Sequence, residues 1–318
     1  MALTLPEAAK LSTTDLQRGV IETFVQESSI LDRIPLLSIS GNAYAYNEEA
    51  TLPGVEFRGI NEAYSESTGT VNQKSESLVI LGGDADVDRF IVQTRGNLND
   101  QRAVQTRMKV KAASFKFADT FFNGDVSANP KSFDGLRKRL TGAQVISAGE
   151  NGAPIVGESD KDRHDFFDLL DALIGRVPGL NSTNGALYAN AAVIAKIKSA
   201  ARRLGGHEMV QETLTGKIVG TYNGIPLLDP NATGGGAEIL PQTETHGKAT
   251  DTSSIYAVRF GEAEGDQAVT GLTNGGVMVD DLGQLEVKPA YRTRVEFYCG
   301  LAVFGGKAAA RLNGVLAK

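Results

Sequence analysis

The feature that most constrains the fold is a long polar stretch in the first third of the chain, residues 41–95. Alanine and tyrosine alternate at 43–46, glycine, proline and threonine punctuate the residues after them, and an apolar run occupies 78–81. This pattern predicts the two strands of a long hairpin. Its middle, Glu62–Lys74, holds few side chains that can join a core, and long excursions of that kind are usually binding or disordered segments. We therefore expect a projecting hairpin that cannot bury itself within one subunit.

Helical spacing occurs on both sides of this hairpin. Thr14-Asp15-Leu16-Gln17 fits a capping box, and the residues after it predict a short amphipathic helix that ends before Pro35. A longer helix is expected over about 99–122, stopped by Gly124. Its predicted buried face recurs in steps of three or four residues: Val104, Met108, Ala112, Phe115, Ala118 and Phe122. Its other faces are expected to carry a solvated basic stripe: Arg102, Arg107, Lys109, Lys111 and Lys116.

The second half of the chain predicts a mixed body of helices and strands. Helical spacing at 165–177 is ended by Pro178-Gly179. A short strand from 186 leads to a helix that Asn190 caps and Gly205 stops. Extended segments are then expected at 221–230, 253–261, 275–283, 284–300 and 301–315.

Composition and charge narrow the function classes. The chain has 318 residues, 41% of them apolar, which allows one large domain or two ordinary ones with a core. A lone cysteine, Cys299, and no apolar run near the ~20 residues of a membrane helix predict a soluble protein that folds in a reducing cytoplasm. Residues 97–142 hold 9 bases and 4 acids, against 7 bases and 14 acids in residues 1–96. This basic segment can meet phosphate or an acidic neighbour, whereas steering of the whole protein toward nucleic acid is not expected at a net charge of −6.

No catalytic or ligand-binding constellation is visible in the sequence. The three histidines lack metal-ligand spacing, no Gly-x-Ser-x-Gly nucleophile elbow occurs, and no glycine-rich phosphate loop opens a helix. Alternating Asp84, Asp86 and Asp88 could bind a cation, but such a row is more often a solvent-facing edge that discourages mispairing. We therefore predict no enzyme activity, no cofactor and no metal. The alternative is an enzyme that holds a metal at this row or at Asp280 and Asp281.

Four short motifs, in order along the chain, resemble those of a known family. They are Phe121-Phe122-Asn123-Gly124-Asp125 with Phe133-Asp134-Gly135-Leu136, Tyr222-Asn223-Gly224-Ile225-Pro226-Leu227, Ser253-Ser254-Ile255-Tyr256, and Gly300-Leu301-Ala302-Val303 through Ala308-Ala309-Ala310-Arg311-Leu312. In these motifs and in its layout, the chain resembles the major capsid proteins of tailed bacteriophages with the Hong Kong 97-type fold. Encapsulin nanocompartments share that fold in outline.

The resemblance implies an α+β fold divided into five regions. An N-terminal arm would occupy 1–40, an extended β-hairpin loop 41–95, and a long spine helix with the start of a peripheral domain 96–142. Residues 143–283 would form mainly an axial domain. Residues 284–318 would be C-terminal strands that return to the peripheral domain.

The resemblance also implies a function. Similar proteins assemble as hexamers and pentamers into an icosahedral shell around double-stranded DNA, bound without sequence specificity. The chain is thus expected in the virion capsid, assembled in the host bacterial cytoplasm, with itself as main partner, scaffolding, portal and decoration proteins as further partners, and no membrane. The alternative is an encapsulin-like shell that holds a cargo enzyme. Some relatives cross-link Lys to Asn of a neighbour, and Lys74 is the only lysine of the hairpin.

The arm, the hairpin and the spine are the elements expected to meet neighbouring subunits, the acidic arm and hairpin of one chain crossing the basic spine of another. The candidate contact residues are Leu16, Val20, Phe24, Glu62, Glu66, Lys74, Arg107, Lys109 and Lys111. At 129–140, the shared apolar face of Phe133, Leu136 and Leu140 predicts a short helix at the joint between spine and body. Its cations are expected to be solvated or paired with an acidic neighbour, and are candidates for facing DNA or another subunit: Arg137, Lys138 and Arg139.

Overall fold

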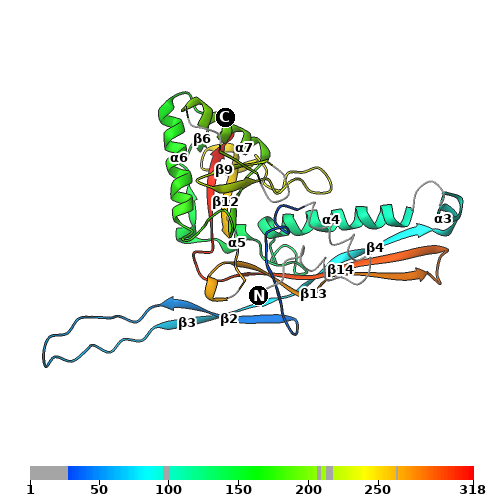
Figure 1. The fold of residues 1–318 in the computed structure, drawn as a ribbon, viewed down its shortest axis with the longest axis horizontal. Helices are drawn as coiled ribbons and strands as arrows, with labels where there is room; N and C mark the ends of the chain where they lie inside the picture. Colours follow the sequence, from blue (N-terminus) through cyan, green and yellow to red (C-terminus); the bar gives the residue numbers. More distant parts are fainter. Residues whose placement is uncertain (1–27, 96–100, 206–208, 213–217, 263) are drawn as a thin grey trace.

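The computed structural model describes residues 28–95, 101–205, 209–212, 218–262 and 264–318. Figure 1 shows three parts: a two-stranded hairpin, a long helix along a four-stranded sheet, and a nine-stranded sheet with two helices. The hairpin and the long helix extend in opposite directions, and the nine-stranded part rises to one side of both (Figure 1). The short helix predicted after Thr14 lies outside the described residues.

The predicted hairpin is confirmed. Strands β2 (Ala43–Thr51) and β3 (Thr70–Ser77) are antiparallel, with Ala43 opposite Ser77 and Tyr46 opposite Lys74. Within the described residues these two strands pair only with each other, and residues 51–75 are exposed wherever their burial is described. Beyond its base, the hairpin therefore projects from the subunit without cover from the other described residues.

The four-stranded sheet and the long helix form the spine of the molecule. The strand order is β1-β13-β14-β4, with β1 parallel to β13 and the other pairs antiparallel. The strands are β1 (Leu36–Ser38), β4 (Val79–Asp88), β13 (Val269–Gln284) and β14 (Ala290–Val303). A short helix, α3 (Arg89–Arg95), precedes the long helix α4 (Gln101–Asn123), which packs on β4 and β14. The helix predicted over 99–122 is therefore confirmed.

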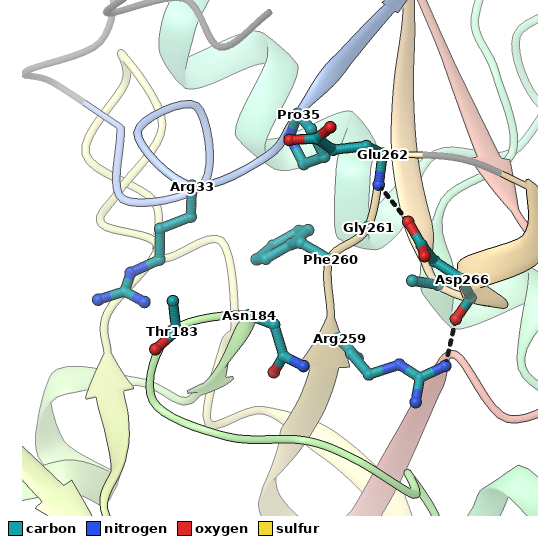
Figure 2. Close-up of a pocket in the computed structure, with 10 residues that line it drawn as sticks. Arg33, Pro35, Thr183, Asn184, Arg259, Phe260, Gly261, Glu262 and Asp266 are labelled. Atoms are coloured by element: carbon teal, nitrogen blue, oxygen red, sulfur yellow. Dashed lines mark hydrogen bonds between the residues drawn. The ribbon is translucent and has the colours of Figure 1, made fainter. Parts of the chain in front are cut away.

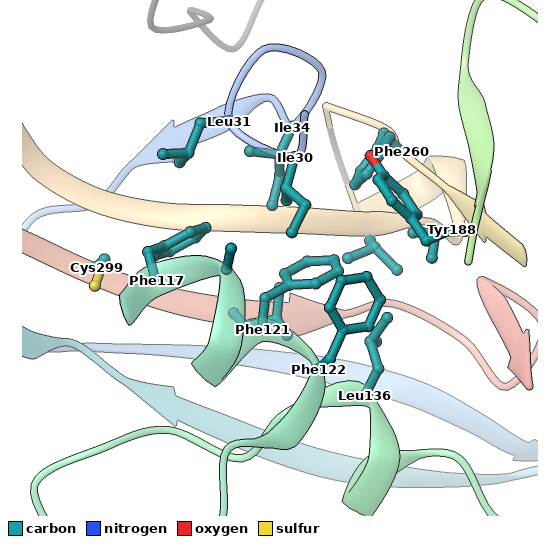
Figure 3. Packing of buried hydrophobic residues seen from close by; sticks show 14 of the residues in the cluster. Ile30, Leu31, Ile34, Phe117, Phe121, Phe122, Leu136, Tyr188, Phe260 and Cys299 are labelled. Atoms are coloured by element: carbon teal, nitrogen blue, oxygen red, sulfur yellow. The ribbon is translucent and has the colours of Figure 1, made fainter. Parts of the chain in front are cut away.

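The buried face of α4 differs from the prediction in its first half. Val104 and Met108 are 40% and 61% exposed, and Ala112 is exposed as well. The buried positions are Thr106, Val110, Ala113, Ser114, Phe117, Ala118, Thr120, Phe121 and Phe122. Only Ala118 and Phe122 of the predicted face are among them. The helix carries two apolar stripes, and the sheet covers the one that leads into the packed phenylalanines of Figure 3, which offer the larger apolar area.

The nine-stranded sheet forms the second body. Its order is β5-β15-β12-β7-β10-β9-β8, with β6 beside β15 and β11 beside β12. The strands are β5 (Val145–Ser147), β6 (Ala153–Pro154), β7 (Gly185–Tyr188), β8 (Met209–Glu212), β9 (Ile218–Tyr222), β10 (Ile225–Leu228), β11 (Glu244–His246), β12 (Ala249–Arg259) and β15 (Ala309–Leu316). The helices are α6 (Asp160–Gly175) and α7 (Ala191–Arg203). Single turns lie at α5 (Leu136–Arg139), η1 (Gly142–Gln144) and η2 (Glu264–Asp266).

Local signals explain several element boundaries. Helix α6 begins five residues earlier than the predicted 165, because Ser159 and Asp162 form a capping box at its start. The predicted cap of α7 is confirmed, since the Asn190 side chain accepts from the backbone N–H of Ala192. Strands β9 and β10 are joined at Asn223-Gly224, whose positive φ angles of 50° and 77° suit a tight hairpin turn.

The nine-stranded sheet separates two cores because its side chains alternate between two faces. On one face, Tyr188 and Tyr256 pack against Phe122 at the end of the spine helix. On the other face, Leu187 and Ile255 join the apolar sides of α6 and α7. The sheet thus links the spine to the two outer helices.

The C-terminal strands divide between the two sheets. Strand β13 pairs with β14 as one long antiparallel hairpin beside β4, whereas β15 crosses into the nine-stranded sheet next to β12. The expected boundary between 283 and 284 therefore falls within the β13–β14 hairpin, because strand pairing holds both strands in one sheet. The extended segments expected at 284–300 and 301–315 correspond to β14 and β15.

Candidate assembly surface

The tip of the hairpin exposes apolar side chains that the described part of the chain does not cover. Val55 and Ile60 are 95% and 94% exposed, and Phe57 is fully exposed. Leu52 and Tyr64 are also exposed. A group of this kind is typical of a surface that binds another protein.

Hydrogen bonds between neighbouring residues hold the tip in shape. The carboxylate of Glu62 accepts from the backbone N–H of Gly59 at 2.7 Å, and the Arg58 guanidinium lies 5.2 Å from the centre of the Tyr64 ring. The Glu56 carboxylate accepts from the N–H of Ser65, which lowers the pKa of Glu56. Of the predicted contact residues, Glu62 therefore has a local structural role.

Two other predicted contact residues lie on the hairpin. Glu66 is exposed. The Lys74 ammonium lies 2.5 Å from the Glu48 carboxylate on the opposite strand. A role of either residue toward another subunit stays a prediction, as does a cross-link at Lys74. The predicted contact residues of the arm, Leu16, Val20 and Phe24, lie outside the described residues.

The first half of α4 combines exposed cations with exposed apolar side chains. Arg107 and Lys111 are exposed, Lys109 is half-buried against β4 near Gly83, and the Lys111 ammonium lies 5.4 Å from the centre of the Phe115 ring. The exposed stripe of Val104 and Met108 belongs to the same helix. The tip has exposed apolar side chains and carboxylates. The apolar side chains of this surface can therefore pack on those of the tip, and its cations can pair with the carboxylates.

The base of the hairpin is locked to the spine by a buried ion pair that sequence reasoning missed. The Arg139 guanidinium donates to both oxygens of Glu76 on β3, at 2.5 and 2.7 Å, and to the carbonyl of Asp134. The Arg139 side chain is only 15% exposed. No local signal connects the two residues of the ion pair, because 63 positions separate them.

Aromatic packing completes this lock. Tyr46 on β2 is buried and packs edge-to-face on Phe304, with ring centres 4.9 Å apart, and its hydroxyl donates to the carbonyl of Val303. Burial and the nearby Glu76 carboxylate raise the pKa of Tyr46 to about 12, so the hydroxyl stays protonated. The direction of the hairpin is therefore fixed by contacts with β14 and with the joint at α5.

The joint places its three cations beside carboxylates of the same chain. The predicted apolar face is buried at Phe133, Leu136 and Leu140. The Lys138 ammonium lies 2.5 Å from Asp125 and 3.0 Å from Asp134, and its hydrogen bond to Asp125 raises the pKa of Lys138. Arg137 lies 3.4 Å from Glu244, and Arg139 binds Glu76. These pairs favour the interpretation of the segment as a structural joint. Contact of its cations with DNA or another subunit stays a prediction.

Two of the three alternating aspartates of β4 are paired with arginines of the neighbouring strand. The Asp84 carboxylate accepts two hydrogen bonds from Arg294, and the Asp86 carboxylate accepts two from Arg292, at 2.6 to 3.0 Å. Each aspartate is directly opposite its arginine on β14. Hydrogen bonds from Arg292 and Lys288 hold the pKa of Asp86 well below its usual range. The predicted edge position is confirmed, since β4 is the outermost strand of its sheet. In addition, cross-strand register brings opposite charges together at Asp84 and Asp86.

The described part of the chain contains no group of three or more metal-ligating side chains. Asp281, one of the alternative metal ligands, lies 2.5 Å from the Arg102 guanidinium. His246 lies 2.8 Å from the carbonyl of Ala148, and His207 is outside the described residues. None of the described helices has the length and apolar content needed to cross a membrane.

A pocket of about 490 Å³ lies between the first described turn of the chain and the end of β12, and Figure 2 shows its lining. Arg33 and Arg259 both line it, but each is held by backbone carbonyls: Arg33 donates to Ser182 and Gly185, and Arg259 donates to Gln267. The Asp266 carboxylate accepts from the backbone N–H of Glu262. These polar groups hold loops together, so the pocket has the character of a structural junction.

Comparison of the chain with known proteins gives a family match and a set of similar structures. Residues 13–157, a little under half of the chain, match the model of the family described as major capsid protein GP7. No curated protein matches the sequence. Among solved structures, the SrpI encapsulin of Synechococcus elongatus PCC 7942 is similar over 100% of this chain and 98% of its own, with a TM-score of 0.66 and 19% identity.

Two further solved structures are also similar. The capsid of the native GTA particle matches 91% of each chain with a TM-score of 0.64 and 13% identity. A Mycobacterium phage Bobi structure matches 90% of this chain and 89% of its own, with a TM-score of 0.59 and 14% identity. The chain has the Hong Kong 97-type fold. The predicted α+β fold class and the resemblance to major capsid proteins and encapsulins are thereby confirmed.

Proposed function

We propose that this chain is a major capsid protein that self-assembles as hexamers and pentamers into an icosahedral shell around double-stranded DNA. The observation that carries the proposal is the exposed hairpin tip, supported by the family match over residues 13–157. A monomer gains nothing from a projecting hairpin whose apolar side chains stay in water, since each buried CH₂ contributes about 0.8 kcal/mol. An assembly in which the tip is buried on another copy gives those side chains their free-energy gain.

The first half of α4 is the surface that we assign to the tip of a neighbouring copy. Its exposed apolar stripe, Val104 and Met108, can bury the apolar side of the tip, and the cations beside it, Arg107 and Lys111, can meet Glu62 and other tip carboxylates. Exposed ion pairs of this kind contribute little affinity but favour one arrangement over others.

The remaining roles follow from this function. The protein would act in the virion capsid after assembly in the host cytoplasm, without an enzymatic activity or a cofactor, and with packaged DNA held without sequence specificity. Scaffolding, portal and decoration proteins would be further partners. The arm at 1–40, the extended loop and the spine keep the limits inferred from the sequence. Strand β15 would belong to the axial domain, because it joins the nine-stranded sheet.

Electron microscopy of the chain expressed alone tests the proposal. We expect closed shells, or rings of five and six subunits. A protein that remains monomeric at high concentration, with or without a scaffolding protein, would contradict it.

A second function is an encapsulin-like shell, favoured by the full-length similarity to the SrpI encapsulin. The contents of shells purified from a native source separate the two. Double-stranded DNA protected from nuclease supports the capsid, whereas a single enclosed protein species supports the encapsulin.

A further inference from the structure

The two helices of the nine-stranded body carry opposite charge. Helix α6 contains five aspartates and two bases, whereas α7 contains four bases and no acid. Both helices bury an apolar side against the sheet and present their charged side to water. The asymmetry therefore lies on the outer surface of this body.

Three of the five aspartates of α6 are occupied within the chain. Asp160 lies 2.5 Å from Arg163, Asp162 completes the capping box, and Asp171 accepts hydrogen bonds from Tyr222 at 2.8 Å and Asn223 at 3.2 Å. The other two, Asp165 and Asp168, are different.

Asp165 and Asp168 are exposed, and neither contacts a base within the part of the chain that the structure describes. Because they are three positions apart, they lie on one side of α6, followed one turn later by the small side chain of Ala172. We name Asp165 and Asp168 the acidic stripe.

Helix α7 has the opposite arrangement. Lys196, Arg202 and Arg203 are exposed, and among the described residues none has a carboxylate partner. The small side chain of Ser199 lies between Lys196 and Arg203 on this side of the helix. These three cations form the basic stripe, and they contrast with the cations of the joint, which lie beside carboxylates of the chain.

The two stripes do not meet within one subunit. Helix α6 packs on β15 and β6 and contacts Tyr222 of β9 through Phe167 and Asp171, whereas α7 packs on β10. Figure 1 shows α6 along the outer border of the nine-stranded body, with α7 to one side of it. No ion pair between the stripes occurs in the described chain. Their complementary charges are therefore free to meet between copies, as far as the described residues show.

We propose that the acidic stripe of one copy docks on the basic stripe of a second copy. This inference rests on the proposed function, because it names one contact through which the subunits would join. Contact between two acidic stripes, or between two basic stripes, places like charges together and is disfavoured. A head-to-tail contact joins opposite charges and leaves a pair of copies with one free stripe of each sign. Its repetition closes a ring where the rotation between copies divides a full turn, as the proposed hexamers and pentamers require.

Charge reversal of one stripe at a time tests the inference. The variant D165K/D168K has two basic surfaces, and K196E/R203E has two acidic ones, so each alone is expected to lose rings and shells at low salt. A mixture of the two variants is expected to regain six-membered rings, because alternating copies restore every contact in a ring with an even number of subunits. A five-membered ring of alternating copies would keep one contact between like charges, so closed shells are not expected from the mixture. The combined variant D165K/D168K/K196E/R203E is also expected to assemble.

Control variants carry the same change in charge on other exposed positions. They are E150K/D251K for the acidic stripe and K248E/K318E for the basic stripe, whose surface ion pairs contribute little. Both controls are expected to assemble like the unmodified chain, as measured by sedimentation and electron microscopy. Circular dichroism of each variant shows that it is folded.

The outcomes separate this inference from the proposed function. Assembly of D165K/D168K or of K196E/R203E alone, equal to that of the unmodified chain, would overturn the docking of the stripes. So would failure of the mixture when both variants are folded. Failure of the unmodified chain itself to assemble would instead contradict the proposed function.

Discussion

At the residue scale, the charges that matter for the fold are those that register or packing brings together over long distances. The sequence predicts that the joint cations pair with an acidic neighbour, but Glu76, Asp125 and Glu244 could not be named as partners because none is close to them in sequence. Asp84 and Asp86 show the same limit, since their arginines are on a strand about 200 residues later.

The lock between Arg139 and Glu76 should contribute measurably to stability. Replacement of Arg139→Met leaves the Glu76 carboxylate largely buried without its partner. We expect the free energy of unfolding to fall by about 2 kcal/mol, below the ~3–5 kcal/mol of a fully buried pair because some solvent reaches both groups. Urea unfolding of the unassembled protein measures this difference.

Two further variants control that measurement. Lys131→Met, on the same segment but exposed, should leave stability unchanged within about 0.5 kcal/mol. The double variant Glu76→Gln with Arg139→Met should recover part of the loss, because no charge is then left unpaired. Equal stability of the Arg139→Met and Lys131→Met variants would show that the ion pair does not hold the hairpin base.

At the element scale, the sequence predicts which helices and strands exist better than it predicts what covers them. The capping box at Ser159 and the Asn-Gly turn at 223–224 are local signals that the structure follows. The face of α4 is different, because Val104 and Met108 continue an apolar stripe as regular as the one that is buried. Only the position of the sheet decides between two such stripes. The residues around β15 also do not indicate that this strand joins the nine-stranded sheet and not the sheet of β13 and β14.

Two alanine substitutions on α4 distinguish its buried and exposed faces. Phe117 is buried between Phe133 and Phe297, so Phe117→Ala should lower the free energy of unfolding by about 3–5 kcal/mol. Met108→Ala removes an exposed side chain and should change it by less than about 0.5 kcal/mol. Thermal or urea unfolding of the unassembled subunit compares the two. A large effect of Met108→Ala would indicate that the predicted face, and not the observed one, is buried.

At the scale of the whole molecule, several apolar and charged surfaces stay uncovered by the residues that the structure describes. The two sheets and α4 account for the core, but the hairpin tip, the exposed stripe of α4 and the charged stripes of α6 and α7 all remain in water. The sequence indicates this excess through the polar stretch at 41–95. It does not indicate that the tip is apolar in space, because Val55, Phe57 and Ile60 are separated by polar residues.

Removal of the hairpin tip should separate folding from assembly. Residues 53–68 lie beyond the last paired residues, Thr51 and Thr70, so a short glycine-serine turn can replace them without loss of Glu76 or Tyr46 at the base. We expect the free energy of unfolding to change by less than about 0.5 kcal/mol, because the tip contacts no core. Shells should be absent, as seen by electron microscopy, because the apolar side chains that would be buried on a neighbour are gone.

A full-length variant distinguishes loss of apolar contact from loss of reach. The substitutions V55S/F57S/I60S/Y64S keep the hairpin length and the Glu62 turn, and should also prevent assembly if apolar burial drives the contact. Normal assembly of this variant, together with failure of the shortened one, would assign the contact to the backbone or the charges of the tip. Normal assembly of both would show that the tip does not join subunits, and insoluble expression of the shortened chain would place the tip in the folding core instead.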